Sequence, residues 1–204
     1  MEVFLLQLII RNYLIELQHI NVKLIFNESL ETNLEPLISI FHDWISEQNS
    51  DELLIDVADY RHVSDGPGII LIGHEANISL TENQRSIILC YNRKLATEGT
   101  DEERFRQAVR GALLACEKIE MDGRLTDKIN FECQEIEILV NDRIFVSNQE
   151  KFYQMVDPKF KGLCKVIFGK NDYSVTHSED PRKIYSIRLK TALPLNKRTI
   201  LQNL

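Results

Sequence analysis

The segment 51–94 constrains the fold more than any other part of this 204-residue chain, because three short apolar runs follow one another within it. The runs cover residues 53–58, 69–72 and 87–90. Nearly continuous apolar runs of this length are typical of central strands that are covered on both faces. We therefore expect a sheet through this segment, with helices from elsewhere in the chain packed on it.

The second run continues as an alternation of apolar and polar residues. Even-numbered positions stay mostly apolar through Leu80, while odd-numbered positions turn polar at Glu75. This period of two predicts one long strand over 69–80. The segments 61–68 and 81–85 then connect it to two neighbouring strands, both antiparallel to it.

Antiparallel pairing on this long strand would bring several polar side chains together. The simplest register places Tyr91 beside Glu75 and Arg93 diagonal to it, with Asp56 near the same level. In a concave, water-accessible setting, Arg93 offers a planar fork for a carboxylate or phosphate, and Glu75 or Asp56 can act as a base or a metal ligand. The alternative is a Glu75–Arg93 ion pair that only sets the strand register. His74 occupies an apolar position of the alternation and is expected in the core.

The connection 61–68 carries a second group of polar residues beside its glycines. His62 and Asp65, together with Asp59 and Ser64, could hold a divalent cation or an anion. The alternative is a turn in which these residues satisfy the backbone geometry. No set of metal ligands is complete in the sequence, so no metal site is predicted.

Periodicity and the capping signals at Thr32 with Glu35 and at Thr100 with Glu103 predict the remaining elements. Strands are expected near 22–26, 129–140, 173–176 and 184–190, and helices over 32–48, 100–123, 152–157 and 158–169. The last two helices are separate because Pro158 is tolerated at a first turn far better than in a helix interior. The apolar face of the strand 129–140 changes parity near Gln134 and Glu135, which predicts a β-bulge. The expected fold class is α+β, a mostly antiparallel mixed sheet with three to four helices packed on it.

The chain length predicts a single domain. We assign that domain to residues 18–190, followed by a C-terminal tail over 191–204. Residues 1–17 form an apolar N-terminal extension, which could be an element packed on the core, a flexible segment, or upstream sequence from an early start codon. Its apolar run is too short to span a bilayer, and it lacks the basic start and cleavage site of a signal peptide.

Composition restricts the partners and the compartment. The formal net charge of −7 and a pI near 5.3 disfavour nucleic acid. The basic C-terminal end lacks the interleaved aromatic residues that stacking on bases requires. The four cysteines are widely spaced and lie within apolar patterns, which favours buried, reduced thiols in a cytoplasmic protein. No membrane is expected as a partner.

The sequence contains no complete catalytic motif. A Walker A sequence, a GxGxxG loop and a GxSxG elbow are all missing, and Ile78 stands where HExxH would need its second histidine. The leading hypothesis is therefore a non-catalytic binding or protein-interaction module, whose partner is a protein or a small anionic ligand. The alternative is an enzyme that acts on a small anionic substrate, possibly with a divalent cation, through the Glu/Asp/Arg cluster. No cofactor is indicated, and edge strands near Val22 and Ile184 could support a homodimer.

Overall fold

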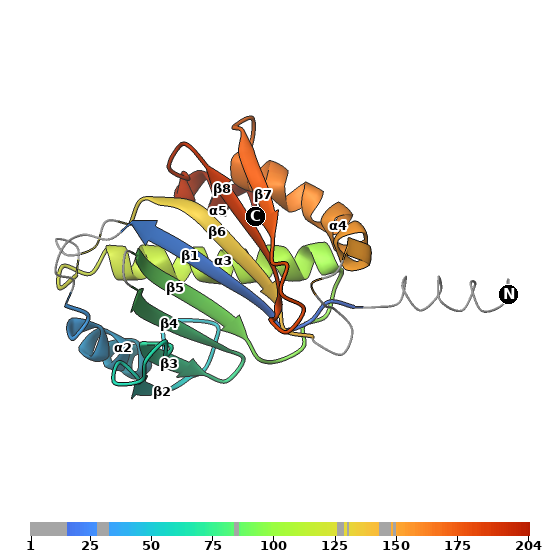
Figure 1. The fold of residues 1–204 in the computed structure, drawn as a ribbon. Helices are drawn as coiled ribbons and strands as arrows, with labels where there is room; N and C mark the ends of the chain where they lie inside the picture. Colours follow the sequence, from blue (N-terminus) through green and yellow to red (C-terminus); the bar gives the residue numbers. More distant parts are fainter. Residues whose placement is uncertain are drawn as a thin grey trace, which may run out of the picture.

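The protein forms one antiparallel sheet with helices packed against it (Figure 1). A computed structural model describes residues 16–27, 33–83, 86–125, 129, 131–142, 148 and 150–204. In these ranges the elements are β1 (Ile20–Asn27), α2 (Pro36–Glu47), β2 (Leu54–Asp59), β3 (Ile69–Gly73), β4 (Ala76–Asn83), β5 (Ser86–Arg93), α3 (Asp101–Glu120), β6 (Cys133–Val140), α4 (Glu150–Phe168), β7 (Tyr173–His177), β8 (Tyr185–Thr191) and α5 (Lys197–Asn203). The eight strands lie in the order β2-β3-β4-β5-β1-β6-β8-β7. The predicted α+β class is confirmed, and every strand pair described is antiparallel.

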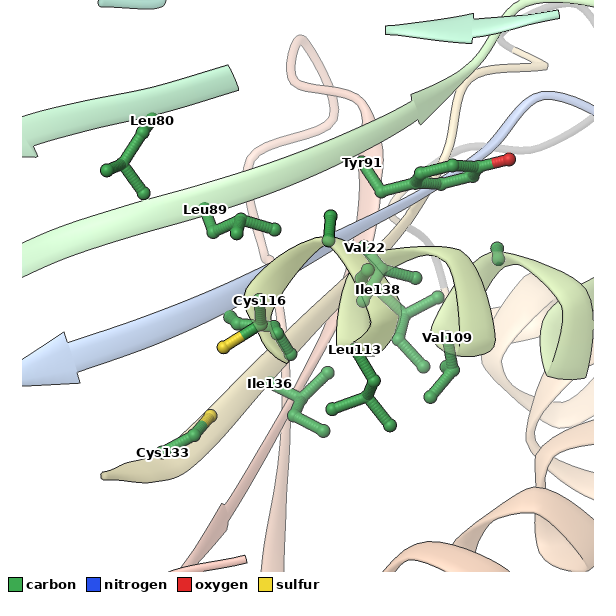
Figure 2. Close-up of a cluster of buried hydrophobic side chains, with 14 of the residues drawn as sticks. Val22, Leu80, Leu89, Tyr91, Val109, Leu113, Cys116, Cys133, Ile136 and Ile138 are labelled. Carbon is green, nitrogen blue, oxygen red and sulfur yellow. The ribbon is translucent and has the colours of Figure 1, made fainter. Parts of the chain in front are cut away.

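One face of the sheet, called here the helix face, holds the core. Val22 of β1 pairs with Tyr91 of β5 and Ile138 of β6, and all three side chains are buried. Figure 2 shows them beside α3, close to its residues Val109 and Leu113. The buried residues of α2, α4 and α5 belong to the same hydrophobic cluster, so the helices share one core with the sheet.

Helix α3 begins and packs as the sequence predicts. Thr100 and Glu103 form a capping box, in which the Thr100 N–H donates to Glu103 Oε2 at 2.6 Å and the Glu103 N–H donates to Thr100 Oγ1 at 3.3 Å. The helix crosses the central strands β5 and β1 (Figure 1). It approaches them closely because Gly111 has no side chain where the ring of Tyr91 lies.

The opposite face of the sheet, called here the open face, is polar at its centre. Lys23 Nζ lies 3.1 Å from Glu137 Oε2, and Arg188 lies 3.1 Å from Glu135 and 3.6 Å from Glu137. Lys190 adds a contact of 3.5 Å to Glu135. Three basic side chains therefore share two carboxylates on this face.

The predicted long strand over 69–80 is wrong. The chain reverses after Gly73, so that β3 and β4 form a hairpin in which Ile72 pairs with Asn77. Glycine is required at the reversal, because a Cβ at Gly73 would lie 2.6 Å from both the Ala76 carbonyl oxygen and the Glu52 carboxylate. His74, expected in the core, is exposed in this turn.

The predicted C-terminal tail over 191–204 is also wrong, because half of it folds as α5. Leu195 and Ile200 are buried in the common core. Asn196 caps the helix, its side chain accepting from the Thr199 N–H at 3.0 Å. Lys197 then ties α5 to the body of the protein by donating to the Phe131 carbonyl at 3.0 Å and to Glu120 at 2.5 Å.

Three smaller predictions have different outcomes. The register of β1 with β6 shifts between Ile25 and Phe26, which leaves Gln134 as an extra residue, so the predicted bulge is confirmed. Pro158 lies inside the single helix α4, so the predicted split is wrong. The strands near Val22 and Ile184 are not edges, since β1 is central and β8 is covered by β7.

The N-terminal prediction falls mostly outside the described residues. Residues 1–15 are not described, and neither is Thr32, which was expected to cap the first helix. Leu17, assigned to the extension 1–17, is buried, and its N–H donates to Asp101 Oδ1 at 2.8 Å. Within the described ranges, no helix combines the length and the apolar character that crossing a bilayer requires.

Candidate functional site

A cleft of about 830 Å³ lies between the connection from β2 to β3 and the open face of the sheet. Its floor is formed by side chains from three neighbouring strands. Lys23 of β1 pairs with Cys90 of β5, which pairs with Ser79 of β4, so the three lie in one row across the sheet. Ile88 and Thr81 form the next row of the floor. Serine, cysteine and threonine are small, so this part of the face is hollow beneath the loop.

The loop over residues 60–68, called here the cleft loop, forms one wall. It is folded by local hydrogen bonds, with the Tyr60 N–H donating to the Gly68 carbonyl at 2.8 Å and the Gly66 N–H donating to the Val63 carbonyl at 3.0 Å. Gly68 adopts φ +75° against the backbone of β4, a conformation and a proximity that exclude a side chain. The Thr81 hydroxyl donates to the Gly66 carbonyl at 3.2 Å, which joins the loop to the floor.

A charge cluster holds the outer side of the cleft loop. The Arg61 guanidinium donates to Asp59 and Glu35 at 2.6 Å each. These hydrogen bonds from Arg61 hold the pKa of Asp59 at about 2, well below its usual range. Arg61 is therefore engaged by two carboxylates and serves to fasten the loop to the segment that leads into α2.

The floor of the cleft contains an ammonium group, on Lys23, that can bind a ligand, and a thiol, on Cys90, that is not reactive. Lys23 Nζ has three N–H donors, of which Glu137 accepts one, so further donors remain for a ligand. Burial raises the pKa of the Cys90 thiol to about 11, so this thiol stays protonated near neutral pH. The floor can bind an anionic group, while Cys90 is not activated as a nucleophile.

The predicted loop residues do not converge as metal ligands. Asp65 lines the cleft in a left-handed conformation with φ 54°. His62 is exposed, with its ring 6.3 Å from that of Tyr60, and Ser64 is exposed as well. Among the residues whose positions are described, no three His, Cys, Asp or Glu side chains converge as metal ligands would.

The predicted Glu75–Arg93 pair is present at the hairpin of β3 and β4. Arg93 Nη1 donates to Glu75 Oε2 at 2.8 Å, and Arg93 Nε donates to the Leu95 carbonyl at 3.0 Å. The Arg93 side chain is only 11% exposed, whereas that of Glu75 is 44% exposed. A backbone hydrogen bond joins the same two segments, since the Lys94 N–H donates to the Glu75 carbonyl at 2.8 Å. These contacts fasten the hairpin to the end of β5.

Tyr91 lies beside this pair as expected, whereas Asp56 does not join it. Tyr91 lies on the helix face, where the Arg93 side chain interacts with it and its hydroxyl accepts from Gln107 Nε2 at 2.9 Å. Burial raises the pKa of Tyr91. Asp56 is exposed and pairs with Ile72, whose row lies on the open face. The predicted assembly of a carboxylate at 56 with Arg93 is therefore wrong, because cross-strand partners share one face of a sheet.

Glu52 takes the position that was expected for Asp56. Its carboxylate accepts a hydrogen bond from the Ala76 N–H at the turn of the hairpin. Burial, and to a lesser extent the nearby charge of Glu75, raise the pKa of Glu52, while the hydrogen bond from the Ala76 N–H and the charge of Arg93 oppose the shift. The sequence signal that could have identified Glu52 is Gly73. If the chain turns at Gly73, the residues just before β2 lie beside that turn, because β2 pairs with β3.

No protein-family model matches this chain, and no curated protein matches its sequence.

Proposed function

We propose that this chain is a non-catalytic binding protein, and that it holds a small molecule with an anionic group in the cleft beneath the cleft loop. The cleft itself carries the proposal. Its volume of about 830 Å³ falls within the range of roughly 300 to 1,000 Å³ that small-molecule sites occupy. Its floor carries the hydroxyl groups of Ser79 and Thr81 on β4 beside Ile88 and Cys90 on β5, which suits a ligand with both polar and apolar parts.

The charges of the open face support an anionic ligand. Three basic side chains share two carboxylates there, although the chain as a whole has a formal net charge of −7. Lys23 is the basic residue of this group that lines the cleft. An anionic group at Lys23 would accept the remaining ammonium N–H donors, and Ser79 and Thr81 would hydrogen-bond to the polar parts beside it.

The protonated state of the Cys90 thiol supports ligand binding without catalysis. Covalent catalysis by cysteine requires a lowered pKa or an adjacent base, and burial shifts the pKa of Cys90 in the opposite direction. The cysteines at 90, 116, 133 and 164 are all free thiols, which favours a reducing compartment and hence the cytoplasm.

The first test measures what binds. Thermal-shift and calorimetric titrations would compare probes of matched shape and different charge: benzoate with benzamide, glucose 6-phosphate with glucose, and inorganic phosphate alone. We expect a charged probe to raise the melting temperature while its uncharged counterpart does not. Small molecules extracted from the purified protein would be identified by mass spectrometry in parallel. If no charged probe binds and nothing co-purifies, the proposal is wrong.

The second test assigns the site. Lys23→Met removes the ammonium group and keeps the length of the side chain, and we expect it to weaken the charged probe more than tenfold, or by about 1.4 kcal/mol. Ser79→Phe fills the floor and should abolish binding of every probe. Lys165→Met on α4 and Ser50→Phe before β2 change exposed residues outside the cleft and serve as controls. Equal binding by all four variants would show that the ligand binds elsewhere.

A further inference from the structure

Strand β7 forms an edge of the sheet without the usual protection against pairing. It comprises Tyr173, Ser174, Val175, Thr176 and His177, a sequence with no proline, lysine or carboxylate. The first four residues are exposed, including Tyr173 at 42% and Val175 at 48%. In the described part of the chain, β8 is the strand that pairs with β7, and no strand pairs with its outer side, as Figure 1 illustrates.

The other edge of the sheet is protected. Strand β2 carries Asp56 and Asp59, and its register with β3 shifts between Leu54 and Asp56. Charges and bulges on an edge strand prevent its backbone from pairing with another chain. The two edges therefore differ in the way expected if one of them has to stay free and the other has a partner.

Every second residue of β7 directs its backbone N–H and C=O groups away from β8. The Ser178 N–H donates to the Ser186 carbonyl at 3.2 Å, which continues the ladder with β8 at the even-numbered positions. In an antiparallel ladder, hydrogen-bonded positions alternate along the strand. The N–H and C=O groups of Tyr173, Val175 and His177 therefore point away from β8.

These outward positions are self-complementary. We propose that β7 pairs with β7 of a second copy of this chain, antiparallel, about a two-fold axis at Val175. In this register Val175 faces its own copy, Tyr173 faces His177, and Ser174 faces Thr176. The outward N–H and C=O groups then meet as hydrogen-bonded pairs, an aromatic ring meets an imidazole, and a hydroxyl meets a hydroxyl. An isologous interface requires this kind of internal symmetry.

The charges that flank β7 agree with the same register. Lys170 and Asp172 precede the strand, and Glu179 and Asp180 follow it, with Asp180 also bound by Arg182 at 3.0 Å. Antiparallel pairing brings Lys170 of one copy beside the acidic flank of the other, and the two-fold axis repeats the contact. His177 is already oriented, since its ring stacks on that of Tyr153 at 4.1 Å and its Nε2 lies 2.9 Å from Asp157.

A dimer held by one short strand from each copy should be weak. We expect a dissociation constant of about 10 to 100 μM, because the area buried is at the low end for specific interfaces. Sedimentation velocity and light scattering of the full chain from about 1 to 500 μM would measure it. A wild-type chain that stays monomeric throughout this range overturns the proposal.

A charge exchange at Val175 tests the two-fold axis. Val175→Lys and Val175→Glu each place a charge against its own copy, so each variant alone should dissociate more than tenfold more readily. An equal mixture of the two variants should recover the wild-type affinity, because opposite charges then meet at the axis. Ile55→Lys on the exposed edge strand β2 is the control and should dimerise like the wild type. Dimers that persist in both single variants, or a mixture that fails to recover, would place the interface elsewhere.

Discussion

Gly111 of α3 lies directly against the ring of Tyr91 of β5: a Cβ at position 111 would be 2.6 Å from Tyr91 Cε2. The ring cannot move away easily, because Tyr91 is buried and its hydroxyl is held by Gln107. The helix and the centre of the sheet therefore touch through a residue that has no side chain. This close contact brings the apolar stripe of α3 onto the core strands (Figure 2).

Replacing this glycine should destabilise the protein, although glycine is a poor helix former. Gly111→Ala in an exposed helix would stabilise by about 1 kcal/mol. Here we expect a loss of about 1 to 3 kcal/mol in the free energy of unfolding, because the added methyl overpacks the core. Urea denaturation followed by circular dichroism measures the difference.

Gly162 of α4 provides the matched control. A Cβ there would meet the end of the flexible Glu102 side chain, which can move. Gly162→Ala should therefore be neutral or stabilise by up to about 1 kcal/mol. If both alanine variants shift the stability in the same direction, the contact between Gly111 and Tyr91 does not limit the packing of α3.

Asn21 should be replaceable with a gain in stability. It lies on the open face of β1, is 6% exposed, and its Oδ1 has no hydrogen-bond partner among the described residues. A buried polar atom without a partner costs about 1 to 3 kcal/mol. We expect Asn21→Val to raise the free energy of unfolding by about 1 kcal/mol, since valine also suits a strand. A loss of stability in the same denaturation assay would mean that the amide has a partner in solution.

Glu52 should make the stability depend on pH between its unfolded and folded pKa values. The folded pKa lies above the usual value of 4.5, so the folded state holds its proton in a window in which the unfolded state has lost it. The contribution of this residue is therefore favourable at low pH and declines as the pH rises through that window. Glu52→Gln keeps an acceptor for the Ala76 N–H and removes the titration.

Denaturation of both proteins from pH 4 to 8 measures this effect. The stability of Glu52→Gln relative to the wild type should increase as the pH rises, and then level off. Glu98→Gln changes an exposed carboxylate and is the control, which corrects for the altered net charge. A difference that is independent of pH, or that shrinks as the pH rises, would contradict the direction of the shift.

The cysteines should resist thiol reagents in the folded protein. Burial raises the pKa of Cys90 and Cys133 to about 11 and that of Cys116 to about 12, and it also raises that of Cys164. Since the thiolate is the reactive form, we expect labelling by Ellman's reagent at pH 7.5 to be about a hundredfold slower than for a free cysteine. Unfolding in guanidinium should expose four reactive thiols. Fast labelling of Cys90 alone would show that the floor of the cleft opens readily.

The hairpin of β3 and β4 shows why the sequence alone was misleading. The inward residues of β3 are odd-numbered, such as Ile69, whereas those of β4 are even-numbered, such as Leu80. A change of parity normally reveals a turn. Residues 69–72 are all apolar, however, so the run has no period and the change is hidden. The alternation beyond Gly73 then looks like the continuation of one strand.

Interactions between residues close together in the sequence determined much of the secondary structure of this protein. The α+β class, the capping box at Thr100 and the bulge at Gln134 depend on hydrogen bonds and periodicities within a few residues of the chain, and the sequence carries that information directly. Only the tertiary structure decided that Glu52 replaces Asp56 at the hairpin, that β7 is an edge, and that Lys23 and Ser79 share the floor of a cleft. Those relationships depend on strand order and register, which are set by the packing of residues far apart in the chain, and a shift of one residue would move each side chain to the opposite face.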